Sequence, residues 1–410
     1  MNDHVFEGTL SASATSGKKE RLLPQIPIAN FLKKLAEILP RLVEFVSSQT
    51  LREHPVWGQA IPYHIPFYGT GTSLGHCIRP DILLTTDGPK ICELDFVPSG
   101  RGYLLAGLDE AQQKETLNVF AEWYRRMGAS KVLYATATTT VCREETELFS
   151  EKLRECCGID ISAVNIDAVS DTELAGAFID RLSYRSEMNN PDEARKNLTG
   201  LTVATAEPYL DSKAIFAMVH DDSLAKALEA TLGKEELSFL RKAFPQTTLV
   251  RRIKEKELPR LATERSKWVL KNSDVETNSS WGCRGTVVGR NYNESKFLGA
   301  LRGEPLNGKD VGMNPILQRW YSSRDFWQVW NAVVKGVFQR TALVQHGREH
   351  HPKTFCEASD EVGARIGFYF LVVRKTGDCL VTPYGDLVLR QDHLIHGASD
   401  AICLPVEAYD

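Results

Sequence analysis

The residues with the clearest chemical potential are four charged side chains on either side of a turn signal: Arg79, Asp81, Glu93 and Asp95. The signal itself is Asp87-Gly88, which is typical of a hairpin between two apolar strands. With a three-residue loop that ends at Gly88, this glycine takes the left-handed conformation and Asp81 lies opposite Glu93. Directly opposed residues share a face of a sheet, and so do residues two apart in a strand. The sequence therefore predicts one polar patch, provided that the loop has this length.

The opposite face of the same hairpin is apolar and is expected to enter a core: Ile82, Leu84, Cys92, Leu94 and Phe96. The assumed loop also pairs Leu83 with Ile91 and Thr85 with Pro89. A slip of one residue would move the acids to different faces. The polar patch is therefore tied to the register of the hairpin.

Three carboxylates on one strand surface repel one another unless a cation neutralises them. Magnesium meets that need, because it takes a few carboxylate oxygens and completes its octahedron with water and phosphate. The patch is therefore a candidate magnesium site. The alternative is a solvated outer face on which Arg79 bridges the acids.

A second segment has features of a phosphate-binding loop. Lys271 ends the apolar stretch 268–270, and a Gly/Ser-rich run with Gly282, Arg284 and Gly285 leads to a second apolar stretch. Glycines let backbone N–H groups close on phosphate oxygens, and the lysine adds a point charge. The run is not a Walker A sequence, because no Gly-Lys-Ser/Thr follows the glycines. A hairpin with a flexible tip explains the same pattern.

Length and charge limit the class of protein. A chain of 410 residues is too long for one compact unit, so two or three subdomains are expected. The net charge of −4 gives no basic field that would attract nucleic acid or an anionic membrane. No apolar run approaches the ~20 residues that span a bilayer. The nine cysteines form no Cys-x-x-Cys pair, which favours reduced thiols and a cytoplasmic location.

Alternation of helical periods and short apolar strands predicts an α/β (α+β) fold. Helices are expected over 28–46 (kinked or divided at Pro40), 109–127, 144–156, 222–232, 234–242 and 324–339. Strands are expected over 131–137, 159–164, 214–220, 268–270, 286–288 and 316–318, with a final meander of 365–374, 379–382 and 386–389. The predicted organisation is a disordered tail (1–20), an N-terminal region with the hairpin and an inserted α/β subdomain (21–205), and nucleotide-binding subdomains (206–410).

Together, these segments resemble those of ATP-grasp enzymes. Arg-x-Asp, eleven residues and Glu-x-Asp is similar to the magnesium-binding segment of that family. That segment usually follows the lysine and glycine-loop strands, whereas here it precedes Lys271. This order resembles a circularly permuted ATP-grasp protein of the glutathionylspermidine synthase type, as does the tail from Asp386 to Asp392. The resemblance implies a permuted ATP-grasp fold with a pre-ATP-grasp-like α/β subdomain.

The resemblance also implies a role for each matching position. Magnesium would be held by Asp81, Glu93 and Asp95. Phosphate or acyl phosphate would be contacted by the catalytic residues Arg79 and Arg390. The nucleotide would be bound by Lys271, Gly282, Arg284 and Gly285, by the strand residues Gln318 and Trp320 near adenine, and by a second lysine, Lys254 or Lys213. Outside the resemblance, Ser99 and Arg101 either bind a substrate carboxylate or belong to a plain turn.

The implied activity is an ATP-dependent ligase that activates a carboxylate as an acyl phosphate and joins it to an amine. Its cofactors would be ATP and Mg²⁺, its partners small-molecule acids and amines, and its products ADP and phosphate. A small-molecule kinase and a non-catalytic nucleotide-binding scaffold are the alternatives. The chain departs from the family at Asp95, where asparagine is usual, and at Val97–Gly102, which replaces an Asp-x-Pro-Thr stretch. Specificity for polyamine and glutathione is therefore not implied.

Overall fold

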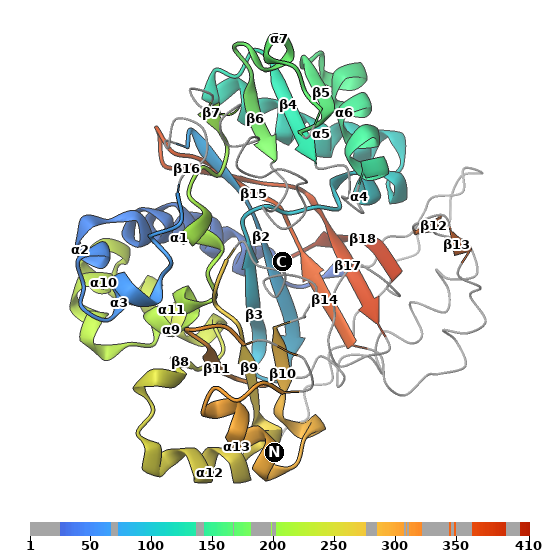
Figure 1. The fold of residues 1–410 in the computed structure, drawn as a ribbon. Helices are drawn as coiled ribbons and strands as arrows, with labels where there is room; N and C mark the ends of the chain where they lie inside the picture. Colours follow the sequence, from blue (N-terminus) through green and yellow to red (C-terminus); the bar gives the residue numbers. More distant parts are fainter. Residues whose placement is uncertain are drawn as a thin grey trace.

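The computed structural model describes residues 25–66, 73–136, 143–166, 168–181, 198, 202–275, 285–306, 309, 311–321, 344–345, 348–349, 363–390 and 402–410. Figure 1 shows a central twisted sheet with an α/β subdomain above it, a helical layer beside it and a smaller sheet below it. The mixed α/β class expected from the sequence is confirmed. In the described part of the chain, no helix is long and apolar enough to span a membrane.

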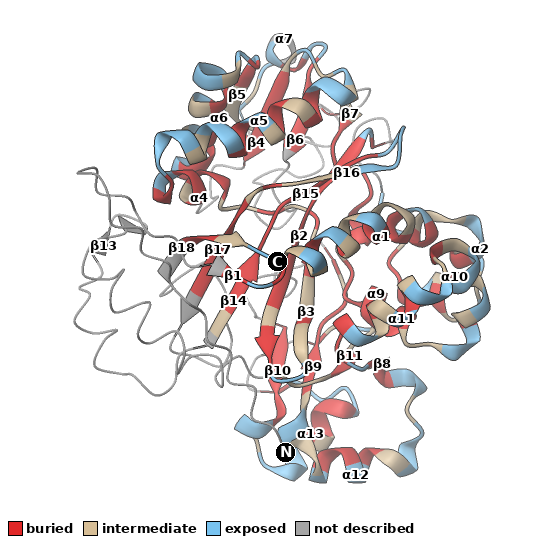
Figure 2. Ribbon diagram, turned by 180° about the vertical axis from the view of Figure 1, so that it is seen from behind, coloured by how far each residue is buried: buried red, intermediate tan, exposed pale blue. Residues whose placement is uncertain are grey.

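The central sheet gathers strands from both ends of the chain. In spatial order they are β1 (Gln25–Ile26), β18 (Ile402–Ala408), β17 (Tyr384–Arg390), β14 (Gly363–Gly367), β2 (Gly75–Thr85), β15 (Phe370–Val373) and β16 (Asp378–Val381), with β3 (Gly88–Asp95) paired to β2. Figure 2 shows that buried residues run along β2 and β15 in the middle of this sheet. The sheet therefore joins strands that precede and follow residue 205.

The predicted C-terminal meander is wrong in its pairing. The expected strand 365–374 is two strands, β14 and β15, and β2 lies between them. β16 pairs with β15, and β17 pairs with β14 and β18, so β16 and β17 are not neighbours. The partner that separates them comes from nearly 300 residues earlier. Local periodicity carries no information about such a distant partner.

The hairpin keeps the predicted register where the charged residues lie and loses it near the turn. Arg79 pairs with Asp95 and Asp81 with Glu93, as expected. Towards the turn, Ile82 pairs with Ile91 and Thr85 with Gly88, so the predicted pairs there are wrong. The connection is a two-residue turn, and an irregularity next to Asp81 absorbs the extra residue. Gly88 has the expected positive φ, at 88°.

The α/β subdomain follows the hairpin. It comprises α4 (Arg101–Gly107), α5 (Glu110–Met127), β4 (Val132–Thr136), α6 (Arg143–Cys157), β5 (Ile161–Asn165), α7 (Asp171–Leu174), β6 (Phe178–Arg181) and β7 (Thr202–Val203). Its four strands are parallel, in the order β5-β4-β6-β7. The boundaries of α5 follow from its caps, because Asp109 forms a capping box with Gln112 and Gly128 ends the helix with φ 71°.

A buried ion pair holds this subdomain together. Arg101 donates to Asp180, and the two side chains are 1% and 0% exposed. Asp180 also accepts from the Tyr124 hydroxyl at 2.6 Å, and the Arg101 guanidinium lies over the Tyr134 ring. The interior location of Arg101 argues against the substrate contact predicted for it.

We expect Arg101→Met to lower the free energy of unfolding by about 3–5 kcal/mol, because it leaves the Asp180 carboxylate buried without its counter-ion. Urea unfolding at neutral pH measures the loss. The control is Arg101→Met/Asp180→Leu, which removes both charges and should recover most of the stability. Equal stability of Arg101→Met and the wild type would contradict the structural role of the pair.

The helical layer covers the apolar side of the hairpin. It contains α1 (Ala29–Ser47), α2 (Gln49–Arg52), α3 (Trp57–Ala60), α9 (Ala214–Val219), α10 (Ala225–Leu232), α11 (Lys234–Ala243) and the 3₁₀ helices η2 (Pro208–Asp211) and η3 (Asp222–Leu224). Pro40 lies inside α1, which is one helix, so it does not divide it. The predicted strand 214–220 is wrong. All six residues of α9 are buried, and a short element that is apolar all round shows no helical period.

The smaller sheet has the order β10-β9-β11-β8 and carries the second motif. Its strands are β8 (Thr247–Leu249), β9 (Trp268–Lys271), β10 (Thr286–Val288) and β11 (Ile316–Arg319), packed with α12 (Leu258–Thr263), α13 (Glu294–Leu301) and the 3₁₀ helices η4 (Val250–Arg252), η5 (Glu255–Glu257), η6 (Arg265–Lys267) and η7 (Gly289–Asn291). The antiparallel pair predicted from 268–270 and 286–288 is confirmed. A two-stranded pair, β12 (Val344–Gln345) and β13 (Arg348–Glu349), lies apart from it. The predicted tail 1–20 and helix 324–339 lie outside the described residues.

A histidine on β2 is buried with no hydrogen-bond partner on either ring nitrogen among the described residues. His76 is 0% exposed, near the Glu207 carboxylate and the Arg374 guanidinium, which are ion-paired with each other. Burial, opposed by Glu207 and assisted by Arg374, lowers the pKa of His76 to about 4. The folded protein therefore favours the neutral ring.

The free energy of unfolding is therefore expected to fall in acid by about 3 kcal/mol on account of His76. The folded-state pKa lies below the unfolded value of about 6.5, so this stability is complete above pH 6.5 and is lost as the pH falls towards 4. Denaturant unfolding of wild type and His76→Leu between pH 7 and 4 measures the effect. Parallel pH profiles for the two proteins would contradict this assignment.

Candidate functional site

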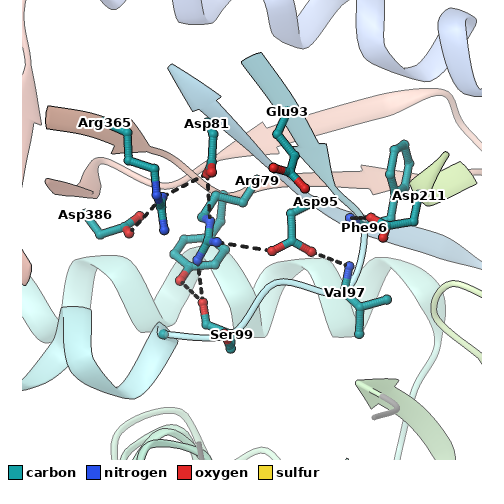
Figure 3. A network of polar contacts seen from close by, with 12 residues as sticks. Arg79, Asp81, Glu93, Asp95, Phe96, Val97, Ser99, Asp211, Arg365 and Asp386 are labelled. Carbon is teal, nitrogen blue, oxygen red and sulfur yellow. Dashed lines mark hydrogen bonds and ion pairs between the residues drawn. The ribbon is translucent and has the colours of Figure 1, made fainter. Parts of the chain in front are cut away.

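The polar patch predicted on the hairpin exists and is largely buried. Arg79 lies between two of the acids: its Nη2 donates to Asp95 Oδ2 at 3.1 Å, and its Nε lies 3.6 Å from Asp81 Oδ1. Its Nη1 donates to the main-chain oxygen of Ser99 at 2.7 Å. Figure 3 shows this guanidinium between the two acids and above the Ser99 segment. The residues Arg79 and Asp81 are 8% and 9% exposed, so the alternative of a solvated outer face is wrong, although its bridging arginine is present.

Residues from the C-terminal strands complete one end of the patch. Arg365 on β14 donates from Nη1 to Asp81 Oδ1 at 2.8 Å. The same nitrogen lies 3.5 Å from Asp386 Oδ2 on β17. Asp81 thus has a guanidinium on each side, one from its own strand and one from β14 (Figure 3).

Two lysines from different parts of the chain meet at the other end, on β3. Lys213 Nζ, just before α9, lies 2.8 Å from Glu93 Oε1. Lys271 Nζ, at the end of β9, donates to the main-chain oxygen of Cys92 at 2.9 Å. Burial alone would raise the pKa of Glu93, but Lys213 and Lys271 outweigh it and hold the pKa below its usual value. Glu93 is therefore ionised at neutral pH.

A further acid, Asp211, adjoins this end of the patch. It closes η2, and its Oδ1 accepts from the main-chain N–H of Phe96 at 3.1 Å. Burial, together with the Asp95 carboxylate and against the opposing effect of Lys213, raises the pKa of Asp211 to about 8. Asp211 therefore carries a proton at neutral pH, which limits the negative charge next to Asp95 (Figure 3).

The acids of the patch have cationic partners within the protein itself. From the sequence we expected a cation to neutralise the acids, either magnesium or a bridging Arg79; in the structure side-chain cations neutralise them: Arg79, Arg365 and Lys213. Within the described ranges, no group of three or more His, Cys, Asp or Glu side chains is arranged to hold a metal ion. The carboxylate oxygens are the ligand type that magnesium prefers, so the donor chemistry fits the ion. An ion bound here would share these acids with the side-chain cations, since Arg79 and Arg365 both contact Asp81 through Oδ1.

The predicted nucleotide residues divide into those beside the patch and those away from it. Lys271 reaches β3, and Gly285 accepts from the Asn272 N–H at 2.8 Å beside it. Gln318 and Trp320 lie on or just after β11, which pairs with β9. Gly282 and Arg284 lie outside the described residues. Lys254 is exposed at the start of η5, whereas the other candidate, Lys213, contacts Glu93.

The other two predicted site residues, Arg390 and Ser99, lie on β17 and just before α4. Arg390 ends β17 opposite Gly363, and its side chain lies outside the described part of the structure. The main-chain oxygen of Ser99 accepts from Arg79 and from the Tyr369 hydroxyl. The amides next to Ser99 already hold a carboxylate, because Gly100 N and Gly102 N donate to Glu145 at 3.0 and 2.9 Å. A substrate carboxylate would have to displace Glu145 from these amides.

Sequence reasoning missed three members of the patch: Asp211, Arg365 and Asp386. Arg365 had a local signal, since it is a single charged residue in an otherwise apolar strand. Asp386 lies in the tail that carries the family resemblance, but it was given no role. Asp211 had no signal, because the segment after it was taken for a strand.

Comparisons with known proteins bear on the fold. No protein-family model matches the sequence, and no curated protein matches it. Among solved structures, a glutathione synthetase-like effector from Globodera pallida in its apo form is similar, with a TM-score of 0.50 and 11% identity over 95% of this chain and 89% of that one. A protein described as a gamma-glutamylcysteine synthetase from Methylobacillus flagellatus has a TM-score of 0.44 and 11% identity over 93% and 87% of the two chains, which is too distant to carry an argument. The chain therefore has a mixed α/β fold similar to that of a synthetase-like protein.

Proposed function

We propose that this protein is an ATP-dependent ligase that activates a carboxylate as an acyl phosphate and joins it to an amine. The observation that supports this most is the meeting of Lys213 and Lys271 at β3, directly beside the arginine–carboxylate patch. Phosphoryl transfer needs little covalent help from a protein and depends on positioning and on cations around the transferring oxygens. The patch and the two lysines supply such cations from four different elements.

The fold we infer is a circularly permuted ATP-grasp fold. The supporting feature is the order of its parts, because the acidic hairpin precedes the lysine strand β9 and the glycine-rich run. The likeness to a glutathione synthetase-like protein agrees with a synthetase architecture. A cytoplasmic location is part of the proposal, since Cys77, Cys92, Cys156, Cys157 and Cys379 are free thiols.

Each residue of the site has a distinct proposed role. Asp81, Glu93 and Asp95 hold magnesium, which supplies charge neutralisation on the transferring phosphoryl group when it is bound. The ATP phosphates are held by Lys271 with Gly282, Arg284 and Gly285, and the adenine end by Gln318 and Trp320. Lys213, which contacts Glu93, takes the role for which Lys254 was the other candidate. Arg79 and Arg390 stabilise the negative charge of the acyl phosphate and of the oxyanion that forms on amine attack.

The proposed reaction has two steps. A carboxylate oxygen attacks the γ-phosphorus of ATP, the bond to ADP breaks, and an acyl phosphate forms. The amine nitrogen then attacks the acyl carbon, loses a proton and displaces phosphate. No covalent enzyme intermediate is needed, so the site requires no nucleophilic side chain.

A screen of amino acids, short peptides and amines for stimulated ADP release tests the proposal. The expected result is at least one acid–amine pair that gives ADP, phosphate and condensed product in equal amounts. ADP without free phosphate would identify the kinase alternative. AMP and pyrophosphate, or no turnover with any pair, would overturn the ligase.

A further inference from the structure

A second buried arginine, Arg365, contacts the acid patch at Asp81. Arg365 Nη1 lies 2.8 Å from Asp81 Oδ1 and 3.5 Å from Asp386 Oδ2. The side chains of Arg365, Asp81 and Asp386 are only 5%, 12% and 10% exposed. Figure 3 shows Arg365 in contact with two carboxylates, Asp81 and Asp386. It lies on the side of Asp81 away from Glu93.

Stability alone gives little reason for these charges. Each buried ion costs several kcal/mol of desolvation, and apolar side chains of similar volume in such places are often neutral or stabilising. The residue directly opposite Arg365 on β17 is apolar, since Arg365 pairs with Val388, which is 1% exposed. Apolar side chains in place of all three charges would therefore suit the sheet, whereas loss of Arg365 alone would leave Asp386 buried without its counter-ion. The specific consequence of Arg365 is the placement of Asp81.

The placement of Asp81 in turn affects Arg79. The Arg79 guanidinium contacts the Ser99 oxygen, Asp95 and Asp81, and the Asp386 carboxylate also acts on it electrostatically. Its Nε is 3.6 Å from the same Asp81 oxygen that Arg365 holds. Asp386 orients Arg365, Arg365 fixes Asp81, and Asp81 limits the movement of Arg79 on its Nε side.

We propose that Arg365 is a positioning residue for phosphoryl transfer, acting through Asp81 on Arg79. This inference rests on the proposed function, in which Arg79 contacts the transferring group. A misplacement of a catalytic group by about 1 Å can cost about 10²-fold in rate, so a distant positioning residue can have a large effect. Lysine is a poor substitute, because its flexible point charge lacks the rigid planar guanidinium that holds Nη1 near both carboxylates.

The test compares wild type with Arg365→Lys and Asp386→Asn. For each protein, kcat is measured with the acid–amine pair that gives the most ADP, and the Kd of Mg²⁺ with a nonhydrolysable ATP analogue is measured by calorimetry. We expect kcat to fall about 10- to 100-fold in Arg365→Lys, with a much smaller change in Kd and a nearly unchanged melting temperature. Asp386→Asn should change kcat in the same direction by a smaller factor. The matched control is Arg260→Lys on the exposed face of α12, which should leave all three values unchanged.

A double-mutant cycle separates positioning through Arg79 from an independent role. If Arg365 acts through Arg79, Arg365→Lys should add little to the loss already caused by Arg79→Lys. Losses that multiply fully would overturn the inference, and so would wild-type kcat in both Arg365→Lys and Asp386→Asn. Should Arg365→Lys not fold, Arg365→Gln in the same cycle carries the test, because Asp386 also acts on Arg79 directly. A wild type without turnover would overturn the ligase and this inference together, whereas an active wild type with unaffected variants would overturn this inference alone.

Discussion

Replacing Glu93 with glutamine is expected to lower kcat by about 10²–10³-fold while the protein stays folded. The proposed magnesium ion contributes several kcal/mol of charge stabilisation in the transition state, and each 1.36 kcal/mol is a factor of ten in rate. Glu93 is the most exposed of the three acids, with a side chain 32% exposed, so its replacement costs little packing. ADP release at saturating substrates and thermal unfolding measure the two parts of this expectation.

The matched control is Glu229→Gln on the exposed side of α10, which should turn over like the wild type. A titration with Mn²⁺, followed by electron paramagnetic resonance, gives a readout that does not depend on turnover. Weaker Mn²⁺ binding in Glu93→Gln than in the control would agree with a metal ligand. Full activity of Glu93→Gln would remove Glu93 from the metal site.

The second large effect is expected at Lys271. Lys271→Met should lower kcat/KM for ATP by about 10²-fold, since it removes a positive charge that acts on the nucleotide phosphates in the proposed site. In this structure Lys271 donates to the Cys92 carbonyl, so the substitution also removes one hydrogen bond, worth about 1 kcal/mol. The loss should appear in the Kd of Mg²⁺ with an ATP analogue as well as in turnover. Lys226→Met on the exposed side of α10 is the matched control.

An unchanged Kd in Lys271→Met, with kcat also unchanged, would indicate that the nucleotide phosphates do not bind at β9. Lys213→Met then becomes the informative variant, because Lys213 is the other ammonium at β3. Loss of nucleotide binding in Lys213→Met alone would assign the phosphates to the α9 side of the site.

The hairpin shows why the patch could be predicted from sequence. The alternation of side chains fixes the shared face of Arg79, Asp81, Glu93 and Asp95, and the pairs formed by these residues are those expected. The turn was one residue shorter than assumed, and only an irregularity beside Asp81 restored the register. The correct patch therefore depended on a local feature that an Asp-Gly signal does not reveal.

The rest of the site depends on distant parts of the chain. Arg365 reaches Asp81 from 284 residues away, and Lys271 reaches Cys92 from 179 residues away. Such contacts are set by strand order, here by the insertion of β2 between β14 and β15. Helix α9 was misread for a related reason, because complete burial erases the periodicity on which sequence reasoning relies.

The most direct test of the central claim follows a labelled oxygen through the reaction. The acid of the active acid–amine pair is labelled with ¹⁸O in its carboxylate and incubated with ATP, Mg²⁺ and the amine. If the protein activates the carboxylate as an acyl phosphate, one labelled oxygen per turnover appears in inorganic phosphate, and ADP is the nucleotide product. Unlabelled phosphate alongside condensed product, or label in AMP, would contradict it.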